Sequence, residues 1–125
     1  MTAAQRYALL IEDEALIAAV ASDALQELGF EVVEASSAKA AMDCAKTDIG
    51  RFAVAVVDLG LPDRKGDELV ADLRALRSDL PVVIATGYGR DAVRNRLADE
   101  RQVAVLTKPY DLDLLRAALQ TLKVM

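Results

Sequence analysis

Short apolar runs alternate along the chain with longer stretches in which apolar residues recur every three or four positions. Four of the five runs are apolar almost throughout, which is typical of strands buried on both faces of a parallel sheet. The second run contains two glutamates and is therefore expected near a sheet edge. The predicted strands span residues 7–11, 31–35, 52–58, 81–85 and 102–106.

The stretches between these runs have the spacing of amphipathic helices. Gly29 is predicted to end the first helix, and Ser36-Ser37 and Asp111 or Asp113 to begin the second and the last. The predicted helices span residues 14–28, 38–46, 67–76, 90–99 and 112–122, the fourth with few apolar anchors. The core stripe predicted for the first helix consists of Ile17, Val20, Ala21, Ala24, Leu25 and Leu28.

Strand and helix alternate five times, which predicts an α/β fold with right-handed crossovers. The expected architecture is a doubly wound, five-stranded parallel sheet of order 2-1-3-4-5 with helices on both faces. The elements fill residues 7–122. We therefore expect residues 1–125 to form one domain, with no output domain.

Composition narrows the class of protein. The net charge of −5 and a pI near 4.7 argue against direct nucleic-acid binding, which favours basic surfaces. No apolar stretch approaches the roughly 20 residues that span a bilayer, and no signal peptide is recognisable, so a cytoplasmic protein is expected. The chain has no histidine and one cysteine, which excludes histidine-based triads, histidine metal sites and an intramolecular disulfide.

Polar residues follow four of the five predicted strands. Because the carboxyl ends of parallel strands meet at one edge, where open α/β sheets bind ligands, these residues are expected to converge. Each alone has an ordinary structural explanation, as a helix-start acid, a strand threonine or an exposed lysine. The set consists of Glu12 and Asp13, Asp58, Thr86 and Lys108.

Three carboxylates that lie together repel one another, and a divalent cation relieves the repulsion. An all-oxygen site without histidine or cysteine suits Mg²⁺. A hydroxyl group and an ammonium group opposite would bind the oxygens of a phosphoryl group, and phosphoryl transfer needs little more from a protein. Asp58 would then be the nucleophile and form an aspartyl phosphate.

With these residues the chain resembles a known family, the response-regulator receiver domain. This domain is the CheY-like, flavodoxin-like module of two-component signalling. The resemblance covers about residues 7–122. It rests on four motifs that follow the predicted strands in order: Leu10-Ile11-Glu12-Asp13, Asp58-Leu59-Gly60-Leu61-Pro62 through Gly66, Ala85-Thr86-Gly87, and Lys108-Pro109-Tyr110.

The resemblance implies a phosphorylated switch that catalyses at most its own phosphorylation and dephosphorylation. Asp58 would accept a phosphoryl group from a histidine kinase or a histidine phosphotransfer protein. Asp13, Asp58 and the backbone carbonyl of Gly60 would bind Mg²⁺ directly, and Glu12 would hold it through water. Thr86 and Lys108 would bind the phosphoryl oxygens, and the Lys108–Pro109 peptide bond would be cis.

One position departs from the family pattern. Receivers commonly carry Tyr or Phe on the fifth strand, three residues before the lysine, and this chain has Val105. A mostly stand-alone subgroup lacks that aromatic residue and carries a Phe-Ala-Thr-Gly-x-Tyr signature, which Ile84-Ala85-Thr86-Gly87-Tyr88-Gly89 matches in part. We hypothesise that Tyr88 takes over the switching role; alternatively, it only shields the mouth of the site. Gly60 and Tyr88 also occupy positions that tune dephosphorylation in the family.

Partner surfaces are also expected. The first helix has a second apolar patch, Ala15, Leu16, Ala18 and Ala19, where the family docks its phosphohistidine partner, although alanines are also simply good helix formers. The fourth and fifth strands with the last helix form the family's usual output or dimer face. A monomer or a weak dimer through that face is expected.

The favoured function is a stand-alone phosphoacceptor switch. The alternatives are a receiver from a longer response regulator or hybrid histidine kinase, and a pseudo-receiver that binds partners without phosphorylation. An unrelated phosphatase or nucleotide enzyme fits least, because no glycine-rich phosphate loop follows the first strand.

Overall fold

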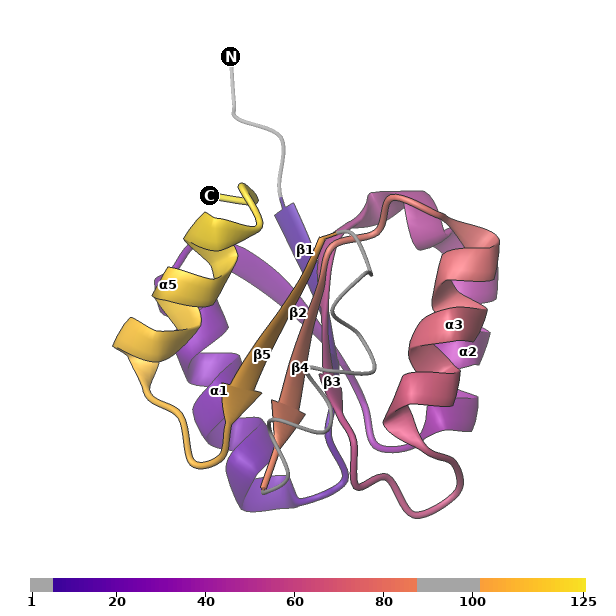
Figure 1. Ribbon diagram of the computed structural model, residues 1–125, viewed down its shortest axis with the longest axis horizontal. Helices are drawn as coiled ribbons and strands as arrows, with labels where there is room; N and C mark the ends of the chain where they lie inside the picture. The colour runs from indigo at the N-terminus through magenta and orange to yellow at the C-terminus, as the bar shows by residue number, and fades with distance from the viewer. Residues whose placement is uncertain (1–5, 88–101) are drawn as a thin grey trace.

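The computed structural model describes residues 6–87 and 102–125, and in this part of the chain the five predicted strands form one parallel sheet (Figure 1). The strand order is β2-β1-β3-β4-β5, which confirms the predicted topology. Each strand begins and ends within one residue of its predicted bounds. The strands are β1 (Arg6–Ile11), β2 (Phe30–Ala35), β3 (Phe52–Asp58), β4 (Val82–Thr86) and β5 (Val103–Thr107).

Helices cover both faces of this sheet. In Figure 1, α1 and α5 lie on one face, and α2 and α3 on the other. Tyr88 and the predicted helix over residues 90–99 lie outside the described residues. The described helices are α1 (Ala15–Glu27), α2 (Ala38–Asp48), the short 3₁₀ helix η1 (Ile49–Arg51), α3 (Gly66–Leu76) and α5 (Leu112–Thr121).

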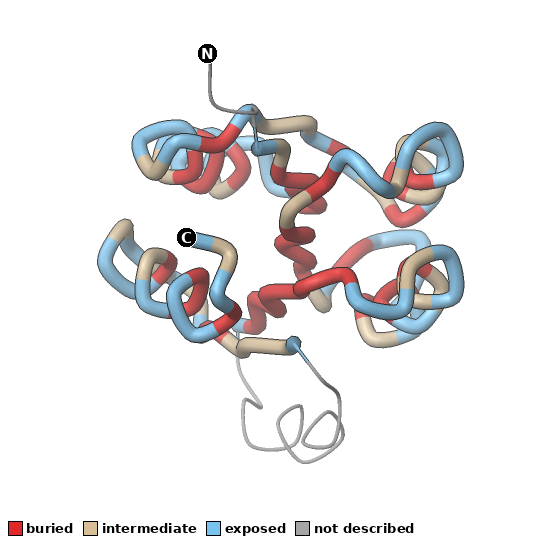
Figure 2. The backbone as a smooth tube through the Cα atoms, turned by 90° about the horizontal axis from the view of Figure 1, so that it is seen from above, coloured by how far each residue is buried: buried red, intermediate tan, exposed pale blue. Residues whose placement is uncertain are grey.

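The sheet divides the core into two layers because successive strand residues point to opposite faces. On β1, Leu9 packs toward α2 and α3, whereas Leu10 packs toward α1 and α5. Figure 2 shows buried residues concentrated along the central strands. At the edge of the sheet, β2 is only partly buried, as its two glutamates predict. The central position of β3 therefore carries its last residue, Asp58, to the middle of one sheet edge.

Two assignments on α1 were wrong. Ala18, predicted to lie on the partner surface, is only 7% exposed, whereas Val20, predicted to lie in the core, is 62% exposed. The buried face consists of Ala18, Ala21, Ser22 and Leu25. Because small residues let the helix approach the sheet closely, Ala18 and Ser22 face inward, and this rotation turns Val20 outward.

The predicted capping residues are confirmed, whereas α2 ends at Asp48, two residues beyond its predicted end. Ser37 Oγ accepts a hydrogen bond of 3.1 Å from the Ala40 N–H at the start of α2. Asp111 Oδ1 accepts one of 2.9 Å from the Leu114 N–H at the start of α5. Gly29 follows α1 with a φ of +98°, a conformation that costs glycine little.

Gly66 allows a close contact that holds the connection between Asp58 and α3. A Cβ atom at this position would lie 2.7 Å from Leu59 Cα and 2.8 Å from the backbone oxygen of Asp58. Both are backbone atoms at the end of β3, so they cannot move aside without moving Asp58. The absence of a side chain therefore allows α3 to begin directly against the backbone at the end of β3.

We expect Gly66→Ala to lower the free energy of unfolding by about 1–3 kcal/mol, the usual cost of overpacking, despite the higher helix propensity of alanine. Urea denaturation measures this change. The control is Gly50→Ala, whose Cβ would lie 3.8 Å from its nearest neighbour, Asp48 Oδ1. Equal stability of the Gly66 and Gly50 variants would contradict the close contact.

Candidate functional site

The structure brings together five of the polar residues predicted to share one sheet edge. Glu12 and Asp13 directly follow β1, Asp58 ends β3, Thr86 ends β4, and Lys108 directly follows β5. Strand register places Asp58 opposite Ala85, one residue before Thr86. Parallel pairing alone accounts for this convergence, because each residue lies at the carboxyl end of its strand.

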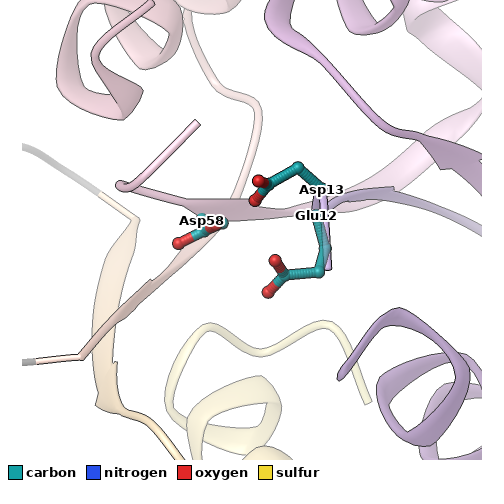
Figure 3. Close-up of side chains that lie close together, drawn as sticks. All are labelled: Glu12, Asp13 and Asp58. Atoms are coloured by element: carbon teal, nitrogen blue, oxygen red, sulfur yellow. The ribbon is translucent and has the colours of Figure 1, made fainter. Parts of the chain in front are cut away.

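Three carboxyl groups form the acidic part of the site (Figure 3). One oxygen from each of Glu12, Asp13 and Asp58 lies within 4.8 Å of the others. Glu12 and Asp58 are buried, with only 5% and 4% of their surfaces exposed, and Asp13 is exposed. Close carboxylates repel one another strongly when they are buried, so this arrangement requires compensating positive charge.

Lys108 supplies that charge within the chain. Its Nζ lies 2.9 Å from Glu12 Oε1 and 3.0 Å from Asp58 Oδ1, and its side chain is only 12% exposed. The backbone fixes its position, because the Lys108 N–H donates a 2.7 Å hydrogen bond to the oxygen of Thr86. The Lys108–Pro109 peptide bond is cis. One ammonium group thus bridges two of three carboxylates.

Asp58 is ionised in this setting. Its burial raises the pKa of the carboxyl group, but its hydrogen bonds, two of them foremost, more than offset this effect and hold the pKa below its usual value. The first is the Gly60 N–H, 3.0 Å from Asp58 Oδ1, and the second is the Lys108 ammonium group. Asp58 therefore presents a carboxylate, the form that can act as a nucleophile.

Glu12 behaves differently although it shares the same lysine. Burial raises the pKa of its carboxyl group. Two hydrogen bonds lower the pKa but do not cancel this effect: one comes from Lys108, and the other comes from the Glu14 N–H, which lies 3.1 Å from Glu12 Oε2. The nearby charge of Asp58 also raises it. For Lys108, burial lowers the pKa, but its bonds to Glu12 and Asp58 prevail and raise it, so the lysine stays cationic.

The connection after β3 completes this edge of the site. The Leu59 N–H donates a 3.1 Å hydrogen bond to the Ala85 oxygen, which continues the pairing of β3 with β4 beyond Asp58. Gly60 is exposed, and a Cβ there would lie 3.6 Å from Asp58 Oδ1, at ordinary contact distance. A side chain at this position would therefore lie directly beside the Asp58 carboxylate.

Thr86 is buried beside this edge. Val105 on β5 is half-buried and packs against the core layer on the α2 and α3 face. Valine therefore occupies the place where the family pattern has an aromatic ring. Tyr88 lies outside the described residues.

Two contacts of this region were not anticipated from the sequence. One is the ion pair between Lys108 and Glu12, because the lysine was expected only on phosphoryl oxygens. The other involves Asp63, whose carboxylate binds the start of α2. Its place two residues after Gly-Leu suggests a turn residue, but the partner lies 24 and 25 positions away, so local sequence gives no signal for it.

The donor set fits Mg²⁺. It consists of carboxylate oxygens, two of them buried and one exposed to solvent, with no nitrogen or sulfur ligand among them. Mg²⁺ prefers oxygen ligands and keeps several waters, so it needs only one or two carboxylates from a protein. The exposed side of Asp13 leaves room for those waters.

Comparisons with known proteins agree with this geometry. The family model described as the response regulator receiver domain matches residues 8–120. The sensor kinase CckA of Brucella abortus (strain 2308) is 31% identical over 104 residues, which are 83% of this chain and 11% of that protein. The chain therefore spans about a tenth of the length of this relative.

Solved structures show the same fold. The chemotaxis protein CheY4 of Vibrio cholerae matches with a TM-score of 0.85 and 25% identity, over 95% of this chain and 99% of that one. A response regulator protein from Burkholderia pseudomallei, solved with a phosphorylated aspartic acid, a calcium ion and citrate, matches with a TM-score of 0.82 and 28% identity. That match covers 94% of this chain and 68% of the other.

The family match spans nearly the whole chain, and the site geometry has the acidic cluster and lysine that its motifs imply. The chain belongs to the response regulator receiver domain family, the phosphoacceptor modules of two-component signalling.

Proposed function

We propose that Asp58 is the phosphoacceptor of this receiver and takes a phosphoryl group from a phosphohistidine on a kinase or phosphotransfer partner. The observation that carries this proposal is the buried Asp58 carboxylate, held ionised 3.0 Å from the Lys108 ammonium group and beside two further carboxylates. The Burkholderia pseudomallei neighbour, which contains a phosphorylated aspartic acid, supports it by analogy.

The transfer needs few groups from this chain. An oxygen of Asp58 attacks the phosphorus atom, an O–P bond forms, the P–N bond to the partner's histidine breaks, and the imidazole keeps the electron pair and takes a proton. Gly60 N–H and Lys108 hold the attacking carboxylate in place before the reaction. Lys108 then moves from the carboxylates to the transferred group, whose other oxygens Thr86 binds.

Asp13, Asp58 and the Gly60 carbonyl would hold Mg²⁺ directly, and Glu12 would hold it through water. The ion, when bound, neutralises the negative charge that gathers as the phosphoryl group approaches the carboxylates. With Lys108 it balances the three carboxylates, which one ammonium group alone does not. Outside its own phosphorylation and dephosphorylation, the domain works as a switch and not as an enzyme.

Because β5 carries Val105 where the family has an aromatic ring, a different residue must couple phosphorylation to the conformational change. Our hypothesis remains that Tyr88 takes this role when Thr86 engages the phosphoryl group. The proposed unit is a single cytoplasmic receiver, alone or within a longer protein, and no described helix is both long and apolar enough to cross a bilayer.

A groove beside the site gives the partner a place to dock. Leu16 and Val20 on α1 are 84% and 62% exposed, and they line one wall of a cavity of about 450 Å³. Lys108, Pro109 and Tyr110 line the opposite wall. The lining is mostly apolar, which suits the side of an amphipathic helix.

The position of this groove favours a helix that carries the phosphohistidine. Lys108 lines the groove, and its Nζ lies 3.0 Å from Asp58 Oδ1. A helix that packs on Leu16 and Val20 would therefore bring its own side chains toward the nucleophile. The exposed Ala15 and Ala19 lie next to Leu16 and Val20 in α1 and line a separate hollow beside Glu12 and Asp13, and they widen the docking face around the helix; Ala18 is only 7% exposed.

We expect wild-type protein incubated with Mg²⁺ and acetyl phosphate or phosphoramidate to gain about 80 Da, the mass of one phosphoryl addition, by intact-mass spectrometry. Asp58→Asn should gain nothing, because the amide is not nucleophilic, and EDTA should prevent the gain in the wild type. The control is Asp43→Asn, an exposed carboxylate on α2, which should be labelled like the wild type. Labelling of Asp58→Asn would place the phosphoacceptor elsewhere.

We expect Leu16→Ser to slow phosphoryl transfer from a phosphorylated histidine phosphotransfer domain at least several-fold more than it slows labelling by acetyl phosphate. The reason is that only the protein donor uses the apolar contact, and burying a leucine side chain contributes about 1.5–3 kcal/mol. Rapid-quench kinetics with both donors measures the two effects. Leu114→Ser, which changes an exposed leucine on α5, is the control. An equal loss of transfer rate in the Leu16 and Leu114 variants would contradict a docking role for Leu16.

Tyr110 leads to a prediction for alkaline pH. Burial first, and then the Glu12 charge, raise the pKa of its phenol from 10 to about 12. Between these values the unfolded chain releases the proton and the folded protein keeps it, so stability falls as pH rises, by at most about 1.4 kcal/mol per pH unit. In urea denaturation, the free energy of unfolding of Tyr110→Phe should fall less steeply between pH 10 and 12 than that of the wild type. Some loss remains in both proteins because the raised pKa of Lys108 acts in the same direction. Parallel curves would show that the phenol does not contribute.

A further inference from the structure

The seven-residue connection 59–65 determines where Gly60 lies relative to Asp58. It leaves β3 at Asp58 and returns to the same backbone at Gly66, whose N–H donates a 3.4 Å hydrogen bond to the Leu59 oxygen. Leu61 anchors it in the core layer between the sheet and α2 and α3. Arg64 forms ion pairs with Glu68 and Asp72 of α3, and Asp63, near the exposed outer end of the connection, makes the contact with α2.

Asp63 binds the start of a different helix. Its Oδ1 accepts a 3.0 Å hydrogen bond from the Ala38 N–H, and its Oδ2 accepts one of 3.1 Å from the Lys39 N–H. These donors belong to the first turn of α2 and have no partner within the helix. Figure 1 shows the connections from β2 to α2 and from β3 to α3 at the same end of the sheet.

The two N–H groups that follow in this turn are satisfied by a local residue. Ser37 Oγ accepts from the Ala40 N–H, and the Ser37 backbone oxygen accepts from the Ala41 N–H at 3.1 Å. The start of α2 is thus capped by Ser37 from its own chain segment and by Asp63 from the phosphoacceptor connection. The negative charge of Asp63 also suits the positive end of the helix dipole, and its two backbone donors hold the pKa of the carboxyl group below its usual value.

The two hydrogen bonds of Asp63 attach the connection 59–65 to α2. The connection cannot move outward unless both bonds from Asp63 to α2 break. Gly60 lies three residues before Asp63, and its N–H bonds to Asp58 Oδ1. A shift at Asp63 would therefore move the Gly60 amide away from the nucleophile and the Gly60 carbonyl away from the proposed metal position.

We propose that Asp63 is a positioning residue for phosphoryl transfer, which fastens the Gly60 connection to the first turn of α2 and so keeps the Gly60 backbone in place beside Asp58. This inference rests on the proposed function of Asp58. Positioning errors of about 1 Å are enough to slow a reaction about a hundredfold, so a modest loosening of this connection is measurable.

The test compares two ways of weakening the same helix cap. Asp63→Ala removes two capping bonds together with the attachment of the connection, whereas Ser37→Ala removes one capping bond and leaves the connection attached. Asp63→Asn keeps one acceptor oxygen and serves as the milder variant should Asp63→Ala fold poorly. For each protein, intact-mass kinetics with acetyl phosphate gives the labelling rate and the Mg²⁺ concentration at half-maximal rate, and circular dichroism gives the melting temperature.

Asp63→Ala should need several-fold more Mg²⁺ for half-maximal labelling and be labelled more slowly, with Asp63→Asn between it and the wild type. Ser37→Ala should melt at a lower temperature but keep the Mg²⁺ requirement of the wild type within about twofold. Equal Mg²⁺ requirements in the Asp63 variants and the wild type would overturn the inference and leave the role of Asp58 intact. Equal losses in Asp63→Ala and Ser37→Ala would also overturn it, since helix stability alone would then explain them. Failure of the wild type to take up a phosphoryl group would overturn the proposed function, and this inference with it.

Discussion

The bridge from the Lys108 ammonium group to Glu12 and Asp58 is the interaction on which the site depends. Two buried carboxylates at this sheet edge would be costly without a counter-charge, since a buried ion that loses its partner typically destabilises a protein by about 3–5 kcal/mol. One ammonium group balances only part of the negative charge of three carboxylates. The site therefore keeps uncompensated negative charge, which suits the proposed binding of a cation.

The same bridge joins the carboxylate cluster to the apolar groove beside it. Lys108 begins the segment that continues through Pro109 and Tyr110 along one wall, and Glu12 accepts a hydrogen bond from Glu14, which lines the groove at the start of α1. If Lys108 binds a phosphoryl group, as proposed, its contacts with Glu12 and Asp58 would change at the end of this groove. The proposed partner binding and phosphorylation would thus share one set of charges.

The backbone around Asp58 is held from three sides. Gly66 lets α3 begin against the end of β3, Leu61 enters the core, and Asp63 reaches the first turn of α2. These contacts use a missing side chain, an apolar side chain and a carboxylate. They explain how a connection with an exposed glycine can hold a defined geometry beside the buried Asp58.

The sequence alone determined the order of the strands and the residues that share the site, because apolar runs mark buried strands and each candidate directly ends or follows one. It did not determine the rotation of α1, since Ala18 and Val20 are both apolar and only close packing on the sheet selects which one is buried. The pairing of Lys108 with Glu12 and of Asp63 with α2 also required the tertiary structure. Periodicity reports contacts within one element, whereas these bonds join segments that the sheet brings together across the chain.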